Sequence, residues 1–98
     1  MEHCDCQRKK CRDPEDKKAL VCRLRRIEGQ IRGIIKMVEN DAWCPDILRQ
    51  STAAREALSA FNRVLLEEHI RTCVTRDLVA GKTETAEELV QTLRSMMK

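Results

Sequence analysis

The stretch LEEHIRTC, residues 66–73, places His69 four positions before Cys73 in a segment without a helix breaker. Residues four apart in an α-helix lie on the same face, about one turn from each other. An imidazole and a thiolate on one face could bind a metal ion, although two ligands rarely make a specific protein site. A packing role for both side chains is the alternative. The pair therefore raises the question of a third ligand.

Cys44 is the candidate for this third ligand, because it would lie at the opposite end of the same helix. It precedes His69 by 25 positions, which is about 37 Å along a straight helix, whereas metal–ligand bonds are about 2.0 to 2.3 Å long. The three donors cannot meet within one chain. In an antiparallel homodimer, Cys44 of one protomer would lie beside His69 and Cys73 of the other. This geometry predicts two equivalent sites per dimer.

Two thiolates and one imidazole form a soft, three-coordinate ligand set. Cu(I) suits such a set best, whereas Zn(II) would ordinarily add a fourth ligand or a water, and Ni(II) would favour more nitrogen and oxygen. We therefore expect Cu(I) as the cofactor.

The first element that would position these donors is a helix that begins near Asp13 and ends near Asn40. Asp13 is suited to the N-cap and Pro14 to the first helical position. Apolar residues then recur at alternating spacings of four and three, a pattern typical of helices packed nearly parallel or antiparallel. This first apolar seam consists of Leu20, Leu24, Ile27, Ile31, Ile34 and Val38.

A second, longer helix begins near Trp43, with Pro45 in its first turn, and nothing interrupts it before Gly81. It would contain about 35 residues and be about 50 Å long. Gly81 fits a C-cap position, and a short third helix follows in which Thr85 and Glu88 have the spacing of a capping box. The second apolar seam consists of Ile47, Ser51, Ala54, Leu58, Phe61 and Leu65.

The predicted fold class is all-α, with three helices that are long, longer and short. A chain of 98 residues buries only a modest core by itself. Two long helices and a short one leave much of both apolar seams uncovered. We therefore expect two chains to pair as a dimeric antiparallel four-helix bundle, and this dimer to assemble into a dimer of dimers.

Composition indicates a soluble helical protein. Charged residues make up 36% and aromatic residues 2% of the chain, as in long packed helices. No apolar stretch approaches the roughly 20 residues of a membrane span, and no apolar signal region follows the basic N-terminus. We expect a cytoplasmic protein without a membrane partner, in which the six cysteines stay reduced. The sequence offers no set of acid, base and nucleophile that would indicate an enzyme.

Positive charge is concentrated in residues 1–40, which contain eleven Lys or Arg against seven Asp or Glu. A solvated helix face is the ordinary explanation for such charge. A symmetric dimer would present the charge twice, which favours contact with the phosphates of duplex DNA. With one Trp, one Phe and no Tyr, base stacking on aromatic side chains is not expected. The candidate DNA-contact residues are Lys18, Arg23, Arg25, Arg26, Arg32, Lys36, Arg55 and Arg63.

The spacing of Cys44, His69 and Cys73 and the stretch RLRRIEGQIRGIIKMVEND, residues 23–41, resemble the CsoR/RcnR family of bacterial metal-sensing repressors, in its copper-sensing branch. The resemblance covers roughly residues 17–97. It implies an all-helical dimer that assembles to a tetramer and binds operator double-stranded DNA without a helix-turn-helix. It also implies that Cu(I) at the intersubunit ligand set lowers DNA affinity and releases transcription of copper-efflux genes.

The resemblance also bears on metal choice and on two residues near the site. Nickel and cobalt sensors of the family carry His at the position of Cys73, and persulfide sensors lack His69. The family often has Tyr before its first ligand cysteine, whereas this chain has Trp43, whose indole N–H can donate but cannot accept. The family's glutamate beside the metal-bound imidazole matches Glu88 with a one-residue gap, and Glu87 is the alternative. Such a carboxylate would accept the imidazole N–H of His69 and couple the third helix to metal occupancy.

Residues 1–12 form a polar, Cys-rich segment that we expect to be a flexible tail. A single helical metal-sensing and DNA-binding domain, residues 13–98, would follow it. The tail could hold a second Cu(I) or pass one to the main site, or it could bind metal only adventitiously. Its candidate metal ligands are His3, Cys4, Cys6 and Cys11.

Three functions are compatible with these residues. The leading hypothesis is a copper-responsive repressor, to which a copper chaperone could deliver the ion. A persulfide-sensing or redox-sensing repressor of the same family would use Cys44 and Cys73, but it would not need His69. A copper chaperone or buffer would use the Cys-rich tail and would not bind DNA.

Overall fold

The computed structural model describes residues 12–98, and the tail ligands His3, Cys4, Cys6 and Cys11 lie outside the described residues. The described chain is helical apart from short turns and contains no strand, which confirms the all-α prediction. It divides into two compact units at Phe61 and Asn62.

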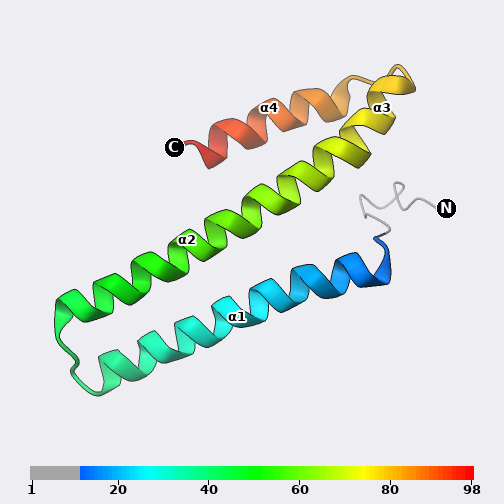
Figure 1. Cartoon of the computed structure of the whole chain (residues 1–98). Helices are drawn as coiled ribbons and strands as arrows, with labels where there is room; N and C mark the ends of the chain where they lie inside the picture. Colours follow the sequence, from blue (N-terminus) through cyan, green and yellow to red (C-terminus); the bar gives the residue numbers. More distant parts are fainter. Residues whose placement is uncertain (1–11) are drawn as a thin grey trace. The chain divides into compact units, whose positions relative to one another are not determined.

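The first unit contains α1 (Pro14–Glu39) and the beginning of α2 (Cys44–His69). As predicted, Asp13 is the N-cap of α1 and Pro14 opens the helix, although the Asp13 side chain makes no capping hydrogen bond. The chain turns after Asn40, where Asp41 adopts a left-handed φ of 56°. It then reverses direction into α2 (Figure 1).

The predicted second long helix is present, with one feature that the periodicity did not show. After the 26 residues of α2, the chain passes without a break through a π-helical turn, η1 (Ile70–Val74), into α3 (Thr75–Val79). The helical path therefore continues almost to Gly81, as predicted (Figure 1). The π-helical turn widens the path by replacing the usual hydrogen bonds to the residue four positions back with bonds spanning five.

The second unit ends with α4 (Glu84–Met96), the short third helix that the sequence predicts. Gly81 adopts a left-handed φ of 83° just after α3, which glycine tolerates because it has no Cβ. The predicted capping box of Thr85 and Glu88 is wrong, because α4 begins earlier, with Thr83 at its N-cap. The Thr85 hydroxyl instead donates a hydrogen bond to the Asp77 carboxylate.

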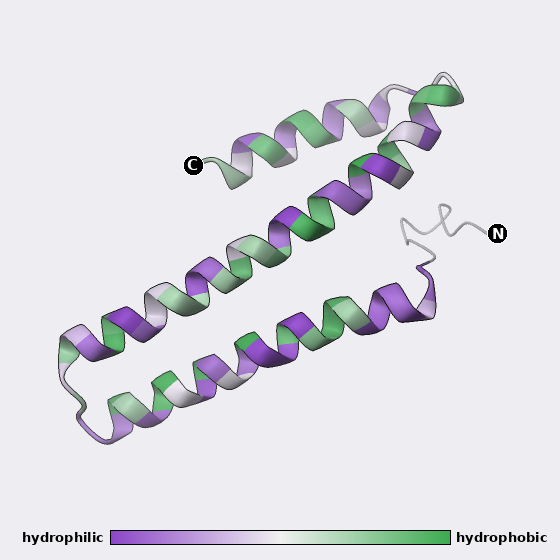
Figure 2. Cartoon of the chain, in the orientation of Figure 1, coloured by the Kyte–Doolittle hydropathy of each residue, from purple (hydrophilic) through white to green (hydrophobic). Residues whose placement is uncertain are grey.

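Both apolar seams are only partly covered in the single chain. Ile27 and Ala54 are buried in the first unit and Val74 in the second. Ile31 is 49% exposed and Val38 is 57% exposed, although both belong to the first apolar seam. Figure 2 shows apolar turns alternating with polar ones along the helices. The described helices include none long and apolar enough to cross a membrane.

Candidate metal site and DNA-binding surface

His69 and Cys73 lie where α2 passes into the π-helical turn. His69 is the last residue of α2, and Cys73 lies within η1. Both side chains are half-buried, so they are partly desolvated while still open to an incoming ion. The structure thus places this pair on one continuous helical segment, four residues apart, as the sequence predicts.

Cys44 is the first residue of α2, whereas His69 is the last. A helix of 26 residues is about 39 Å long, so Cys44 cannot share a metal ion with His69 of the same chain. In agreement, no group of three or more His, Cys, Asp or Glu side chains within residues 12–98 could hold a metal ion. The described part of one chain therefore does not bring Cys44 together with His69 and Cys73.

The donor chemistry at these positions nevertheless fits a soft metal. Cys44 and Cys73 are free thiols, and Cys44 is exposed at the start of its helix. The deprotonated thiolate is the form that binds metals. Cys44 is accessible to a partner chain at the start of α2.

Two threonines make hydrogen bonds around His69 and Cys73. Thr72 Oγ1 donates to the Glu68 carbonyl at 2.7 Å and lies 3.7 Å from Cys73 Sγ. Thr75 Oγ1 donates to the Ile70 carbonyl, also at 2.7 Å. The two carbonyls belong to the residues directly before and after His69. No helical period predicted this arrangement, although the Thr-Cys-Val-Thr pattern is visible in the sequence.

The helix α4 packs against η1 and α3 in the second unit, which places Glu88 on an element adjoining the turn that carries Cys73. Glu88 is exposed on α4. The hydrogen bond from Thr85 to Asp77 fastens α4 to α3. Trp43, the other residue expected near the site, precedes α2 and is 72% exposed, so its indole is available to a partner chain.

Asp77 is a half-buried carboxylate whose pKa is lowered in the folded chain. The hydrogen bond from Thr85 lowers the pKa of Asp77, and the neighbouring cations Arg76 and Lys82 also lower it, while partial burial opposes them. Arg76 Nε donates to Asp77 Oδ1 at 3.2 Å. Asp77 is therefore a charged anchor for the α3–α4 turn, and it was not predicted because its partner Thr85 was assigned to a capping box.

The eight candidate DNA-contact residues all have exposed side chains. Seven of them lie in the first unit, and Arg63 lies in the second. Arg32 Nη1 lies 3.7 Å from Glu28 Oε1, and both side chains are more than half exposed, so the pair contributes little stability and Arg32 remains available to a phosphate. The structure therefore presents these basic side chains on the surface.

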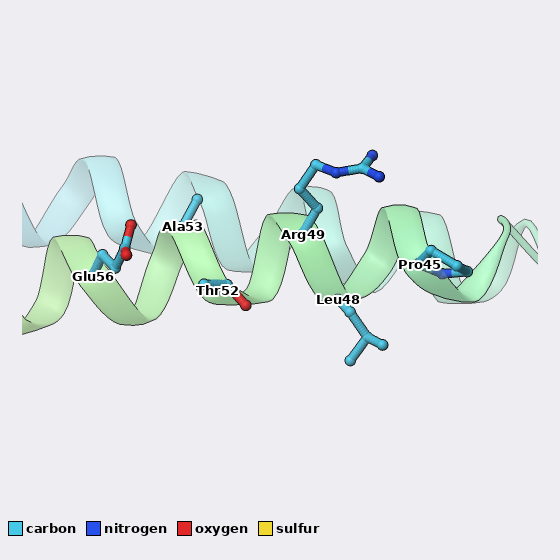
Figure 3. Close-up of a pocket in the computed structure, with 6 residues that line it drawn as sticks. All are labelled: Pro45, Leu48, Arg49, Thr52, Ala53 and Glu56. Carbon is cyan, nitrogen blue, oxygen red and sulfur yellow. The ribbon is translucent and has the colours of Figure 1, made fainter.

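An open hollow runs along the first turns of α2, and one face of that helix lines it. Its lining residues are Pro45, Leu48, Arg49, Thr52, Ala53 and Glu56. Leu48 and Arg49 extend away from the helix in different directions (Figure 3), and Arg49 pairs with Asp46 at 2.9 Å. The hollow is open to solvent, and no thiol or imidazole lines it.

Residues 12–98 are helical apart from short turns, and they carry the thiols of Cys44 and Cys73 and the imidazole of His69 on α2 and η1. Residues 16–95 match the family of metal-sensitive transcriptional repressors. Because the match covers most of the sequence, the chain belongs to this family of repressors, which are not enzymes.

Curated relatives include copper-sensing repressors. The chain is 41% identical over 85 residues to the copper-sensing transcriptional repressor CsoR of Bacillus subtilis, covering 86% of this chain and 84% of the relative. It is 35% identical over 79 residues to the CsoR of Mycobacterium tuberculosis, covering 80% of this chain but 66% of the relative. The chain thus spans slightly less than two thirds of the mycobacterial protein's length.

Two solved structures share the fold. The copper-sensing repressor CsoR with Cu(I) from Geobacillus thermodenitrificans has a TM-score of 0.86 and 38% identity, covering 90% of this chain and 93% of that one. The nickel-responsive transcriptional regulator InrS has a TM-score of 0.70 and 40% identity, covering 81% and 90%. The fold is therefore compatible with more than one metal, and the ligand residues must distinguish them.

Proposed function

We propose that this chain is a Cu(I)-responsive transcriptional repressor, which binds operator DNA without metal and is released when Cu(I) binds. The observation that carries the proposal is the position of two thiols and one imidazole at the two ends of a long helix, in a family of metal-sensitive repressors. These donors are Cys44, His69 and Cys73. The released genes would be those for copper efflux.

The choice of Cu(I) over nickel depends on the donor atoms. Two sulfur donors and one nitrogen donor favour Cu(I), whereas Ni(II) prefers more nitrogen and oxygen ligands. The CsoR of Bacillus subtilis, which is 41% identical to this chain, is likewise named for copper sensing. Both considerations favour Cu(I) as the ion that this chain senses.

A homodimer would complete the site and cover the apolar seams. Leu24, Ile31 and Val38 are 40%, 49% and 57% exposed in the single chain, and a stable helix would bury such a seam against another helix. Pairing two chains as an antiparallel four-helix bundle would do so, and would bring Cys44 of one protomer to His69 and Cys73 of the other. Two such dimers would form the tetramer.

The exposed basic residues would hold operator DNA through its phosphates. A symmetric dimer doubles the surface formed by residues such as Lys18, Arg25 and Lys36, which are exposed on α1. Contacts of this kind depend strongly on salt because they release counterions. Since its operator DNA lies in the bacterial cytoplasm, we place the protein there.

Copper release requires that Cu(I) bind unequally to two conformations of the repressor, because an ion with equal affinity for both shifts nothing. Bound Cu(I) would join Cys44 to His69 and Cys73 across the dimer. The second imidazole nitrogen of His69 would remain free to donate to Glu88 on α4, and Trp43 would lie beside Cys44. Because α4 packs on η1, a shift in His69 could move α4 and thereby alter the DNA-binding surface.

The decisive experiment replaces Cys44 by Ala and measures operator binding by fluorescence anisotropy with and without Cu(I), under reducing and anaerobic conditions. In the wild type, Cu(I) should weaken DNA binding by about 5- to 150-fold, the usual range of allosteric coupling. Cys44→Ala should bind the operator normally and lose this response. The matched control is Cys22→Ala, which removes another exposed thiol and should respond like the wild type.

Two further results would contradict the proposal. If Cys44→Ala still releases DNA when Cu(I) is added, the ligand assignment is wrong. If a sulfide donor releases DNA from the wild type and Cu(I) does not, the protein is a persulfide sensor. Deleting residues 1–12 tests the tail, because a copper chaperone would lose most of its Cu(I) affinity whereas a repressor would keep its main site.

A further inference from the structure

The π-helical turn η1 occurs at the pair of proposed metal ligands. His69 immediately precedes η1 and Cys73 lies within it. The Thr75 backbone N–H donates to the Ile70 carbonyl, five residues earlier, which is the hydrogen bond that defines a π-helix. Such turns are rare, and they occur frequently at functional sites because they cost stability without improving packing.

Two threonine hydroxyls support this wide turn. Thr75 Oγ1 donates to the Ile70 carbonyl at 2.7 Å, so that this carbonyl accepts both the backbone and the side chain of Thr75. A side-chain bond over five residues differs from the usual threonine bond in a helix, which reaches three or four residues back. Thr72 Oγ1 donates to the Glu68 carbonyl at 2.7 Å. The hydroxyls thus supply extra donors where the regular ladder is interrupted.

The width of the turn affects how His69 and Cys73 face each other. In a regular α-helix, residues four apart are offset by about 40° around the axis, since each residue turns by about 100°. A turn closed over five residues contains more residues, so each residue rotates less about the axis than in an α-helix. The π-helical turn therefore changes the rotational offset between His69 and Cys73 from the value that a regular α-helix would give them.

We propose that Thr72 and Thr75 are positioning residues, which hold η1 open and thereby set the relative placement of the His69 imidazole and the Cys73 thiolate for a shared metal ion. This inference rests on the proposed function as a Cu(I) sensor. The Thr72 hydroxyl, which donates to the Glu68 carbonyl, also lies 3.7 Å from Cys73 Sγ. Neither threonine would itself bind the metal.

The test compares a variant carrying Thr72→Val and Thr75→Val with one carrying Thr72→Ser and Thr75→Ser. Valine keeps the branched shape and removes the hydroxyl, while serine keeps the hydroxyl. Because both threonines are exposed, valine creates no cavity and the variant should fold, as circular dichroism would show. Thr52→Val, at an exposed position within α2, controls for loss of a hydroxyl in a regular helix.

Two readouts are needed. In the metal-free protein, amide hydrogen exchange at Val74 and Thr75 should become faster in the valine variant and stay unchanged in the serine variant. In a competition titration with a Cu(I) chelator, the valine variant should lose about 10-fold or more in affinity, as when groups that orient metal ligands are removed. The serine and Thr52→Val variants should bind like the wild type.

The outcomes separate the two proposals. If the valine variant matches the wild type in both exchange and Cu(I) affinity, the positioning role is wrong while the Cu(I) sensor stands. If exchange changes and Cu(I) affinity does not, η1 depends on the threonines but does not set ligand placement, and the inference is again overturned. If the wild type itself has no tight Cu(I) site, the proposed function fails and this inference fails with it.

Discussion

At the scale of single residues, the protein combines uncommon donors with ordinary helix chemistry. Cys44, His69 and Cys73 have the donor atoms that Cu(I) prefers, whereas most other polar side chains are solvated. Asp77 is the exception, since it anchors the turn between α3 and α4 by accepting hydrogen bonds from Thr85 and Arg76. This anchor gives a pH dependence that can be measured.

Replacing Asp77 by Asn should destabilise the second unit at neutral pH and have little effect in acid. The pKa of Asp77 is lowered in the folded chain, first by the hydrogen bond from Thr85. A lowered pKa means that the folded state favours the charged carboxylate. The contribution of Asp77 to the free energy of unfolding is therefore complete above the ordinary aspartate pKa, about 3.9. This contribution is lost as the pH falls through the lowered pKa of the folded state. Thermal unfolding at neutral pH and near pH 3 would measure the difference.

The control for this prediction is Asp46→Asn, which removes a carboxylate that pairs with Arg49 on the exposed surface of α2. Equal melting temperatures for Asp77→Asn and the wild type at neutral pH would show that the anchor does not stabilise the fold.

At the scale of elements, the ends of the helices are determined by local chemistry. Asp13, Pro14 and Gly81 occupy the positions that their types predict. The start of α4 differs from the prediction, because two acceptable threonines lie two residues apart and only tertiary contact with Asp77 distinguishes them. The two glycines Gly81 and Gly33 provide a direct comparison of backbone requirements.

Gly81→Ala should lower stability by about 1 to 2 kcal/mol, because Gly81 has a φ of 83° and a left-handed conformation is costly for residues with a Cβ. Gly33→Ala should raise stability by about 0.5 to 1 kcal/mol, since it lies within α1 and a Cβ there would meet nothing within 4 Å. Urea unfolding monitored by circular dichroism would measure both. Stabilisation by Gly81→Ala would contradict the assigned turn.

At the scale of the whole molecule, the single chain is incomplete in two respects. Large apolar side chains of both helical seams remain partly exposed, and no metal-binding group of three side chains forms anywhere in the described part of the chain. A partner copy would correct both deficiencies. This explanation can be tested by mixing two defective chains.

Chains with Cys44→Ala should regain Cu(I) binding when they are refolded together with chains carrying both His69→Ala and Cys73→Ala. Each mixed dimer would contain one intact site, formed by Cys44 of one variant and by His69 and Cys73 of the other. With random pairing, the mixture should bind about a quarter of the wild-type Cu(I), because half the dimers are mixed and each has one of two sites. A chelator competition titration would measure this capacity.

Each variant alone should bind no Cu(I) at the main site and serves as its own control. If the mixture binds no more Cu(I) than the separate variants, the three ligands do not come together between two chains.

The sequence by itself determined the helices and their order, and it predicted the residues that would bind a soft metal. Helical periodicity, Pro14 and Gly81 act over a few neighbouring residues, so they can be recognised without knowing the fold, and the length of a helix sufficed to separate Cys44 from His69 within one chain. Only the tertiary structure decided the π-helical turn η1 and the bond between Thr85 and Asp77. The reason is physical, because a hydrogen bond that is shifted by one position along the chain leaves the apolar pattern of the sequence almost unchanged. Whether such a bond forms depends on which neighbouring element packs against that part of the helix.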